Sequence, residues 1–418
     1  MSILFTNARL IDPVSGIETL GELRIVDGKI ATSGTAETVI DCRGKCLAPG
    51  IIDIGVKICE PGERHKESFR TAGLAAAAGG VTTMVTRPDT IPNVDTPEIL
   101  TFATLRGAAM SKVRIAPMAT LTKERVGREM VEMGFLLDAG AVGFTDGDQV
   151  VSDTKVLLRA MTYAKSLDAL VMGHPQEPTL SKGASVTSGK FASLRGLAAV
   201  SPMAERMGLE RDLALVEMSG VRYHADQVTT ATSLPALIRA KEAGLDVTAG
   251  VSIHHLTLNR LDVGDYRTFF KVKPPLRSEE DRLAMIDAVA DGVIDVVCSM
   301  HSPQDEESKR LPFEEAASGA VALETLLPAA MRLVHAGAIE LPILWRALSL
   351  NPARRLGLEG GTLEVGAPAD LVLFDPDAPF VMDRLSLKSK SKNTPFDGQR
   401  MEGRVLRTFV GGEEIYHA

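Results

Sequence analysis

An alternation of strand-like and helix-like segments through the middle of the chain is the feature that most constrains its fold. Eight apolar, strand-like runs occur there, at residues 48–58, 81–86, 113–119, 141–145, 170–174, 221–228, 246–255 and 293–301. Helical patterns such as FRTAGLAAAAGG separate them. Eight strand–helix repeats predict a closed (β/α)8 TIM barrel. A doubly wound open sheet is the alternative, but its glycine-rich phosphate loop is missing after the first strand, where the sequence reads EPGERHKE.

Both ends of the chain have a different pattern, with short alternating strands that break at Asp-Gly and Arg-Gly turns. We therefore predict a small β-sandwich domain composed of residues 1–50 and 356–418, attached to a barrel of residues 51–355. Aromatic residues make up only 4% of the chain and apolar residues 45%, a mixture typical of tightly packed α/β layers.

Charge and targeting signals exclude several classes of protein. The net charge is −8 and no basic cluster is present, so neither nucleic acid nor an anionic membrane is an expected partner. No apolar run reaches the roughly 18 residues of a membrane span, and the N-terminus lacks the pattern of a signal peptide. We therefore expect a cytoplasmic protein whose four cysteines (Cys42, Cys46, Cys59 and Cys298) are reduced thiols, without a zinc clip at the first pair.

Ordered phrases along nearly the whole chain carry a family resemblance. They include APGIIDIGV, AAAAGGVTT, RPDTIPNVD, HHLTL, KVKPPLR, NPARRLGL and GTLEVGAPADLVL. In this order they resemble dihydroorotases of the metal-dependent amidohydrolase superfamily. The resemblance implies a one- or two-zinc centre at the carboxyl ends of the barrel strands, which polarises water for attack on a cyclic amide.

Most of the implied metal positions carry residues that cannot serve as ligands. The family's first strand ends in P-G-x-I-D-x-H-x-H, whereas this chain has Gly55 and Lys57 at the two histidine positions. Glycine has no donor atom, and an ammonium ~4 Å from a divalent cation costs about 8 kcal/mol at an effective dielectric near 20. The sixth-strand histidine is replaced by Gln227. The eighth-strand aspartate, which is metal ligand and general base in the family, is replaced by Met300.

Two implied ligands remain, Asp146 after the fourth strand and His174 after the fifth. Catalytic zinc normally takes three protein ligands and a water, so we predict no cofactor and no catalytic residue. We expect these two side chains to bond each other or Lys57, and the ammonium of Lys57 to fill the metal position and pair with Asp146. A catalytic role for Lys57 as base or Schiff-base amine is the less favoured alternative.

The implied substrate contacts are replaced as well. Cys59 stands at the position of a carboxylate-binding arginine, Asp89 and Lys273 at asparagine positions, and Gln304 at a histidine position. We expect an anionic Asp89 to repel an anionic substrate. Loss of ligands and substrate contacts together indicates a site that no longer catalyses the family's reaction.

The remaining polar groups are interpreted structurally. We expect His254, His255 and His301 to serve the architecture, His65 to be solvated, and His224 to point away from the site. The cluster Lys271, Lys273 and Arg277 is interpreted as a solvated rim or partner contact, with anion binding as the alternative, and residues 386–393 as an exposed linker.

Three functions follow from this interpretation. The first is an inactive, dihydroorotase-like subunit of the kind that, by resemblance, associates with aspartate carbamoyltransferase in pyrimidine biosynthesis, with self-association. The second is an active zinc-dependent dihydroorotase or related cyclic amidohydrolase with a degenerate metal site. The third is a small-molecule sensor that uses the barrel mouth as its pocket.

Overall fold

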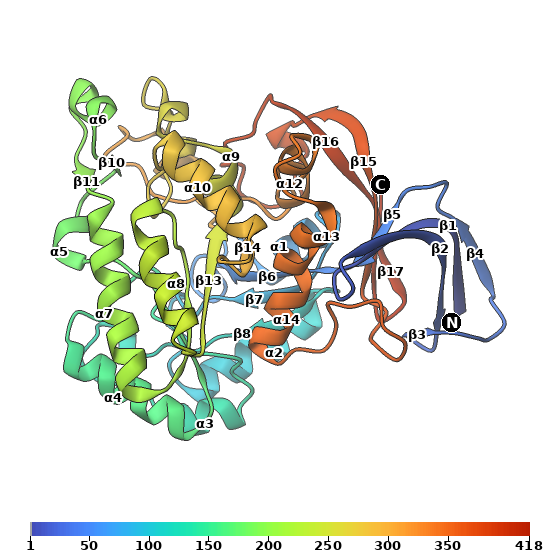
Figure 1. Cartoon of the computed structure of the whole chain (residues 1–418), viewed down its shortest axis with the longest axis horizontal. Helices are drawn as coiled ribbons and strands as arrows, with labels where there is room; N and C mark the ends of the chain where they lie inside the picture. Colours follow the sequence, from blue (N-terminus) through green and yellow to red (C-terminus); the bar gives the residue numbers. More distant parts are fainter. Residues whose placement is uncertain (1) are drawn as a thin grey trace.

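The structure, a computed structural model, describes residues 2–418 and confirms the predicted TIM barrel with a β-rich domain beside it (Figure 1). Seven regular parallel strands form the barrel wall: β6 (Ile51–Val56), β7 (Val81–Thr86), β8 (Arg114–Pro117), β9 (Leu170–Gly173), β12 (Arg222–Ala225), β13 (Val247–Ser252) and β14 (Val296–Cys298). The predicted fourth run, 141–145, contributes only bridges from Phe144 to Ala119 and Val171. Two hydrogen bonds join β14 and β6 near their carboxyl ends. The Ser299 N–H donates to the Asp53 carboxylate (2.8 Å), and the Lys57 N–H donates to the His301 carbonyl oxygen (2.9 Å).

Helices cover the outside of this wall (Figure 1). The longer ones are α1 (Phe69–Ala78), α2 (Pro97–Met110), α4 (Thr154–Ser166), α7 (Met203–Ser219), α8 (Leu234–Glu242), α10 (Glu279–Ala290) and α12 (Leu326–His335). Shorter ones are α3 (Met133–Asp138), α5 (Pro178–Ser181), α6 (Lys190–Arg195), α9 (Ile253–Thr257), α11 (Glu306–Arg310), α13 (Leu341–Trp345) and α14 (Asn351–Leu356).

Helix α1 illustrates how the sequence determines these elements. Ser68 accepts a hydrogen bond from the N–H of Thr71, and the Thr71 side chain accepts one from the N–H of Ser68, which forms a capping box. Most of the alanines that follow (Ala72, Ala75, Ala76 and Ala77) are buried and allow close packing. Gly79 ends the helix where a Cβ would lie 1.9 Å from Leu323 O, so only glycine fits against the following segment.

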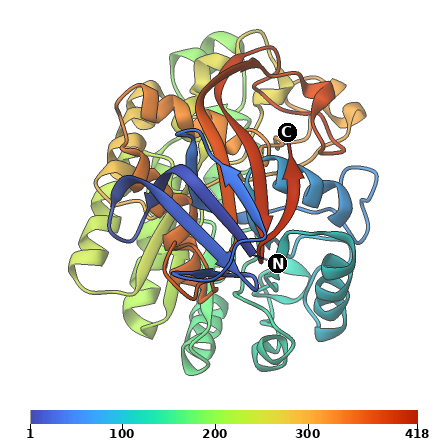
Figure 2. The same ribbon diagram turned by 90° about the vertical axis from the view of Figure 1, so that its right-hand side faces the viewer.

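The two ends of the chain form one sheet, in the order β17-β16-β15-β5-β1-β2-β3, with β4 paired to β1 (Figure 2). Its strands are β1 (Ser2–Asp12), β2 (Ile17–Val26), β3 (Lys29–Ala31), β4 (Thr38–Asp41), β5 (Cys46–Pro49), β15 (Leu371–Val381), β16 (Arg400–Val410) and β17 (Glu413–His417). The rings of Phe5 in β1 and Phe409 in β16 meet edge to face at 5.2 Å. Because these strands are not neighbours, the contact shows that the sheet curls around a core of its own.

The segment 386–393, predicted to be an exposed linker, is instead packed against the barrel. Ser389, Ser391 and Asn393 are buried. The Glu324 carboxylate accepts from the backbone N–H of Lys388 and of Ser389, at 2.7 and 3.0 Å. The linker prediction was wrong because polar side chains that are satisfied by tertiary contacts have the same composition as solvated ones.

No helix among residues 2–418 has the length and apolar character needed to cross a membrane.

Candidate functional site at the mouth of the barrel

A chain of ion pairs occupies the mouth of the barrel, where the carboxyl ends of the strands converge. Arg87 donates to Asp89 through Nε and Nη2, both at 3.0 Å, in a bidentate pair. Asp148 lies 2.6 Å from Arg125 Nη2 and 3.1 Å from Lys273 Nζ. We call this set the mouth network, and its members are Lys57, Glu63, Arg87, Asp89, Arg125, Asp148 and Lys273.

Lys57 projects from the end of β6 into this network. Its Nζ lies 3.2 Å from Asp89 and 3.8 Å from Glu63. Burial by itself would lower the pKa of Lys57, but the Asp89 carboxylate outweighs that effect and holds the pKa above its ordinary value. Lys57 is therefore a cation at neutral pH. The predicted pairing with Asp146 was wrong, because the Asp89 and Glu63 carboxylates hold the ammonium instead.

Asp146 and His174, the two ligand positions that the resemblance implies are retained, do not bond each other. Asp146 accepts hydrogen bonds from the backbone N–H of Leu121 and of Thr122, both at 2.9 Å. His174 is buried, and its Nε2 has no hydrogen-bond partner within residues 2–418. Burial and the charge of Lys273 lower the pKa of His174 to about 3, so its imidazole is neutral at physiological pH. The predicted bonds from His174 to Asp146 or Lys57 are absent between these residues.

The Asp89 carboxylate is ionised and lies between two cations. Burial alone would raise the pKa of this carboxyl, but Arg87 and then Lys57 hold it below its ordinary value. Burial alone would also raise the pKa of Asp148, but Arg87, Lys273 and Arg125 outweigh burial and keep this pKa below its ordinary value. Asp89 is therefore anionic, as expected, and the adjacent cations Arg87 and Lys57 offset its charge.

The cavity over the metal position is small. It has a volume of about 90 Å³ and is lined by Lys57, Gln227 and Met300, among others. Ligand sites usually measure about 300–1,000 Å³. Gln227 is held by a hydrogen bond from the Ser252 N–H to its Oε1 at 3.1 Å. A Cβ on Gly55, whose φ is +89°, would lie 2.9 Å from the Met300 sulfur, so Met300 fills the space beside this glycine.

Of the predicted substrate positions, Asp89, Lys273 and Gln304 line this small cavity, and Cys59 does not. Cys59 is buried, and burial raises the pKa of its thiol to about 12. Gln304 donates through its amide to Ser318 O at 2.9 Å. Lys273 is committed to Asp148, with its side chain 45% exposed.

These residues do not fit a catalytic zinc ion. Four implied ligand positions carry no suitable donor: a glycine without a side chain, an ammonium, an amide and a thioether (Gly55, Lys57, Gln227 and Met300). At a fifth position, the Asp146 carboxylate already accepts two backbone N–H bonds. Across residues 2–418, no cluster of three His, Cys, Asp or Glu side chains has a geometry that could hold a metal ion.

Metal removal is accordingly expected to leave the protein unchanged. Chelation by EDTA should not shift the thermal unfolding midpoint, since no binding energy of a metal contributes to folding. Elemental analysis after gel filtration should find far less than one zinc per chain. A stoichiometric zinc ion whose removal lowers the midpoint would contradict this prediction.

The histidines outside the implied metal positions lie in different surroundings, and the expected strand position of one pair is corrected. His301 is buried and accepts from the Ala322 N–H at 3.2 Å, whereas the side chain of His65 is 64% exposed. His224 bonds Thr248 and does not line the mouth cavity. His254 and His255 lie on helix α9 rather than on a strand, and both border the mouth cavity.

Sequence reasoning missed most of the mouth network and misplaced Arg277. Arg277 is 2% exposed and pairs with the fully buried Glu205 at 3.1 Å, so it is not on a solvated rim. Lys271 is also buried and donates to Glu314 O. A signal for Arg87 was available, because it lies two residues before Asp89 in RPD. Arg125 and Asp148 had no local signal, since the loops that bring them together are far apart in sequence.

A second, wider cavity of about 430 Å³ lies beside the first. Val150, Pro178, Val200 and Pro275 contribute apolar walls. Polar lining comes from His174, Gln176, Lys182 and Ser181. Asp148 and Lys273 border both cavities, so their ion pair lies between them.

Comparison with known proteins agrees with this architecture. Residues 44–233 match the family model described as dihydro-orotase-like. A dihydroorotase of Wolbachia sp. subsp. Drosophila simulans (strain wRi) is 39% identical over 423 residues, which cover 99% of this chain and 95% of that relative. A dihydroorotase-like protein of Pseudomonas putida is 37% identical over 418 residues, which cover 99% and 98%.

Among solved structures, an L-hydantoinase (dihydropyrimidinase) from Arthrobacter aurescens superposes with a TM-score of 0.90 at 25% identity, covering 99% of this chain and 96% of that one. The similarity in sequence and in fold therefore extends over nearly the full length of this chain and of each of these proteins. This chain belongs to the dihydroorotase-like family of amidohydrolases.

Proposed function

We propose that this chain is a non-catalytic, cytoplasmic member of its family that serves as a structural and activating subunit for aspartate carbamoyltransferase in pyrimidine biosynthesis. The observation that supports it most is the Lys57 ammonium, held 3.2 Å from Asp89 at the position of a metal ligand. A permanent cation at that place opposes a divalent metal by Coulomb repulsion. The proposal includes self-association of the chain within the assembly.

The chemistry of the mouth supports the same conclusion. Hydrolysis of a cyclic amide needs a group that takes a proton from water, and the thioether of Met300 cannot do so at neutral pH. Burial raises the pKa of Asp53 to about 6, but its carboxylate accepts from Ser299 N–H, is fully buried and does not line the mouth cavity. The remaining carboxylates of the mouth network are paired with cations.

Co-expression with the aspartate carbamoyltransferase of the same organism tests the proposal. We expect the two chains to co-elute on gel filtration and the transferase to be more active with this chain than without it. The same preparation, supplied with zinc or manganese, should not turn over dihydroorotate, while an authentic dihydroorotase does so in parallel. Absence of both co-elution and activation would reject the proposed function.

A different outcome of the hydrolysis assay would favour an active cyclic amidohydrolase, the alternative that agrees with the similarity to a dihydroorotase and an L-hydantoinase. Turnover at an ordinary enzymatic rate, with a dependence on added metal, would establish it and overturn our proposal.

The wider cavity favours a sensor as a second candidate. Its volume of about 430 Å³ lies in the range of small-molecule sites, and its lining combines apolar walls with Lys182 and Lys273. Thermal-shift measurements with anionic pyrimidine intermediates, in the absence of metal, would detect such binding.

A further inference from the structure

The connection between β15 and β16 leaves the β domain and packs against the loops at the barrel mouth. We call residues 386–396 the strap. In its first half, every second side chain is buried (Leu387, Ser389 and Ser391), whereas Lys388 and Lys390 between them are exposed. Residues 393–396 are then buried without a break. One face of the strap therefore lies on the barrel and the other faces solvent.

Asn393 joins the strap to the loops that form the walls of the small mouth cavity. Its Nδ2 donates to Ser302 O at 3.2 Å and to Gly319 O at 3.0 Å. Its Oδ1 accepts from the Gln304 N–H at 3.2 Å. Ser302, Gln304 and Gly319 all line the cavity of about 90 Å³, whereas Asn393 does not. Asn393 is therefore a positioning residue, which acts on the cavity through its walls.

The far end of the strap holds a further wall. The buried Phe396 ring stacks on the His254 ring at 5.8 Å between centroids, and His254 lines the same cavity. Neither ring nitrogen of His254 has a hydrogen-bond partner within residues 2–418, so packing, including this stacking, fixes the ring.

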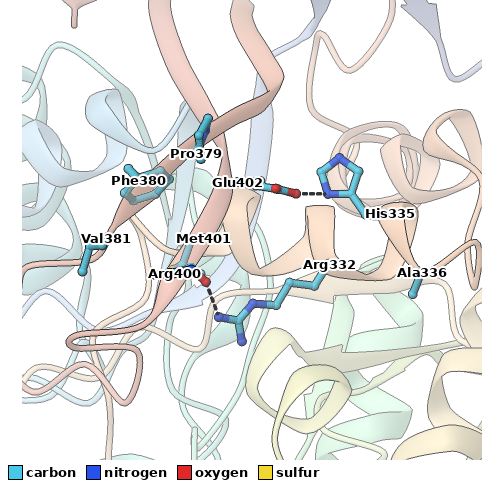
Figure 3. A pocket seen from close by; sticks show the side chains of 9 residues that line it. All are labelled: Arg332, His335, Ala336, Pro379, Phe380, Val381, Arg400, Met401 and Glu402. Atoms are coloured by element: carbon cyan, nitrogen blue, oxygen red, sulfur yellow. Dashed lines mark hydrogen bonds and ion pairs between the residues drawn. The ribbon is translucent and has the colours of Figure 1, made fainter.

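Arg332 of α12 secures this end of the strap from the other side. It borders a groove of about 720 Å³ between α12 and the β15–β16 ribbon, and it donates to Arg400 O at 3.1 Å (Figure 3). Its guanidinium lies 5.4 Å from the Phe396 ring. Phe396 is thus held between Arg332 and the wall of the mouth cavity.

Two buried carboxylates anchor the first half of the strap. Glu324, which precedes α12, accepts from the N–H groups of Lys388 and Ser389, at 2.7 and 3.0 Å. Glu67 accepts from the Ser389 hydroxyl and lies 3.5 Å from His301 Nε2. His301 follows β14, so these anchors connect the strap to the end of a barrel strand at the mouth.

The contacts of the strap differ in kind from those of the barrel wall. Only Leu387, Pro395 and Phe396 among its residues are apolar, and hydrogen bonds supply most of its other contacts with the barrel. A hydrogen bond contributes little net stability, because water replaces the partner on release. Segments with few buried apolar contacts open at a lower cost than the whole domain unfolds.

We infer that the strap is a releasable closure of the barrel mouth, which while attached keeps the small cavity closed and on detachment opens it through the loops at 302–304 and 319–321. The barrel wall stays folded in this opening. The inference does not depend on the proposed function, because it concerns the walls of the cavity and not a partner.

Cys298 reports on this opening. Gln227 lines the cavity and donates through Nε2 to Cys298 Sγ at 3.4 Å, so the thiol lies one contact away from the cavity. Cys298 and Cys42 are each 2% exposed, and Cys42 lies in the core of the β domain. Buried thiols react only after the structure opens around them. Alkylation by iodoacetamide, quantified for each cysteine by peptide mass spectrometry, therefore measures local opening at Cys298 with Cys42 as the internal reference.

Asn393→Ala removes the bonds from the strap to the mouth loops. We expect it to accelerate alkylation of Cys298 by about tenfold, since each lost hydrogen bond contributes roughly a factor of two to ten to local stability. The rate at Cys42 should stay unchanged. Limited digestion should also cut this variant first after Lys388 or Lys390, because trypsin needs a detached segment.

Asn351→Ala is the matched control. The Asn351 amide donates to Asp295 O at 2.8 Å, just before β14 and thus at the opposite end of the strand that carries Cys298. Its loss should leave the ratio of the Cys298 and Cys42 rates unchanged. If Asn393→Ala fails to fold, Ser389→Ala, which removes only the hydroxyl bond to Glu67, should show the same selective acceleration to a smaller extent.

Two results would overturn the inference. If Cys298 and Cys42 accelerate together in the strap variant, Asn393 supports global stability and the strap is not a separate closure. If neither rate changes and trypsin cuts elsewhere first, the mouth stays closed without the bonds of the strap.

Discussion

Replacing Glu205 by alanine is expected to lower the free energy of unfolding by about 3–5 kcal/mol, the range for breaking a buried ion pair by removal of one partner. Glu205 is fully buried, and Arg277, its partner at 3.1 Å, is 2% exposed. The carboxylate also accepts from the N–H groups of Thr229 and Thr230, at 2.8 and 2.9 Å, and from Ser233 Oγ at 3.0 Å. The substitution would leave a buried guanidinium and several donors without an acceptor.

Urea-induced unfolding of Glu205→Ala, followed by circular dichroism, would measure this loss. Arg206→Ala is the matched control, because the next residue of α7 pairs with Glu210 at 3.0 Å on the surface, with the two side chains 42% and 39% exposed. Exposed pairs contribute less than about 1 kcal/mol. If both variants lost the same small amount of unfolding free energy, the buried Glu205–Arg277 pair would not stabilise the barrel.

Replacing Asp89 by asparagine, the residue that the resemblance implies at this position, is expected to destabilise the protein by about 3 kcal/mol, although Asp89→Asn is nearly isosteric. The amide cannot neutralise Arg87, which donates two bonds of 3.0 Å to the carboxylate, or Lys57 at 3.2 Å. Asparagine is thus unfavourable at position 89 in this mouth network.

The stability difference between wild type and Asp89→Asn is expected to depend on pH. The pKa of Asp89 is lower in the folded state than its ordinary value, so its contribution to stability is present above the unfolded pKa of about 4 and is lost as the pH falls through the folded pKa. The difference in unfolding midpoint between wild type and Asp89→Asn should therefore be constant near neutral pH and shrink in acid.

Asp265→Asn is the control for this measurement, because Asp265 pairs with Arg195 at 2.7 Å on the surface and is 88% exposed. Its effect should be small at all pH values. A wild-type advantage over Asp89→Asn that grew in acid would contradict the charge assignment of the mouth network.

Particular elements show how far the sequence could lead. The runs at 81–86 and 170–174 became strands β7 and β9 almost without change, because buried parallel strands are continuous apolar runs. The run at 141–145 forms only bridges at Phe144, which periodicity cannot distinguish from a full strand. His254 and His255, which follow β13, were expected on a strand but lie on the short helix α9. Five residues are too few to show a helical period in the sequence.

Side-chain partners within the site were the least predictable part. The sequence identified Lys57 at a ligand position but not its partner, and the expectation of Asp146 failed because Asp146 is held by the backbone of residues 121–122. Arg277 and residues 386–393 were expected at the surface, although both are packed. Composition predicts solvation, whereas a buried polar group requires only that tertiary contacts satisfy it.

The sequence by itself determined the barrel, the pairing of both ends in one β domain, and the identity of the residues at the implied ligand positions, Gly55, Lys57, Gln227 and Met300. Residue identity and period are local properties, so they can be recognised without coordinates. The tertiary structure alone decided which carboxylate holds Lys57, that the mouth cavity measures about 90 Å³, and that Arg277 is buried against Glu205. These features depend on distances between loops that are remote in the chain, and Coulomb energy and packing depend on those distances.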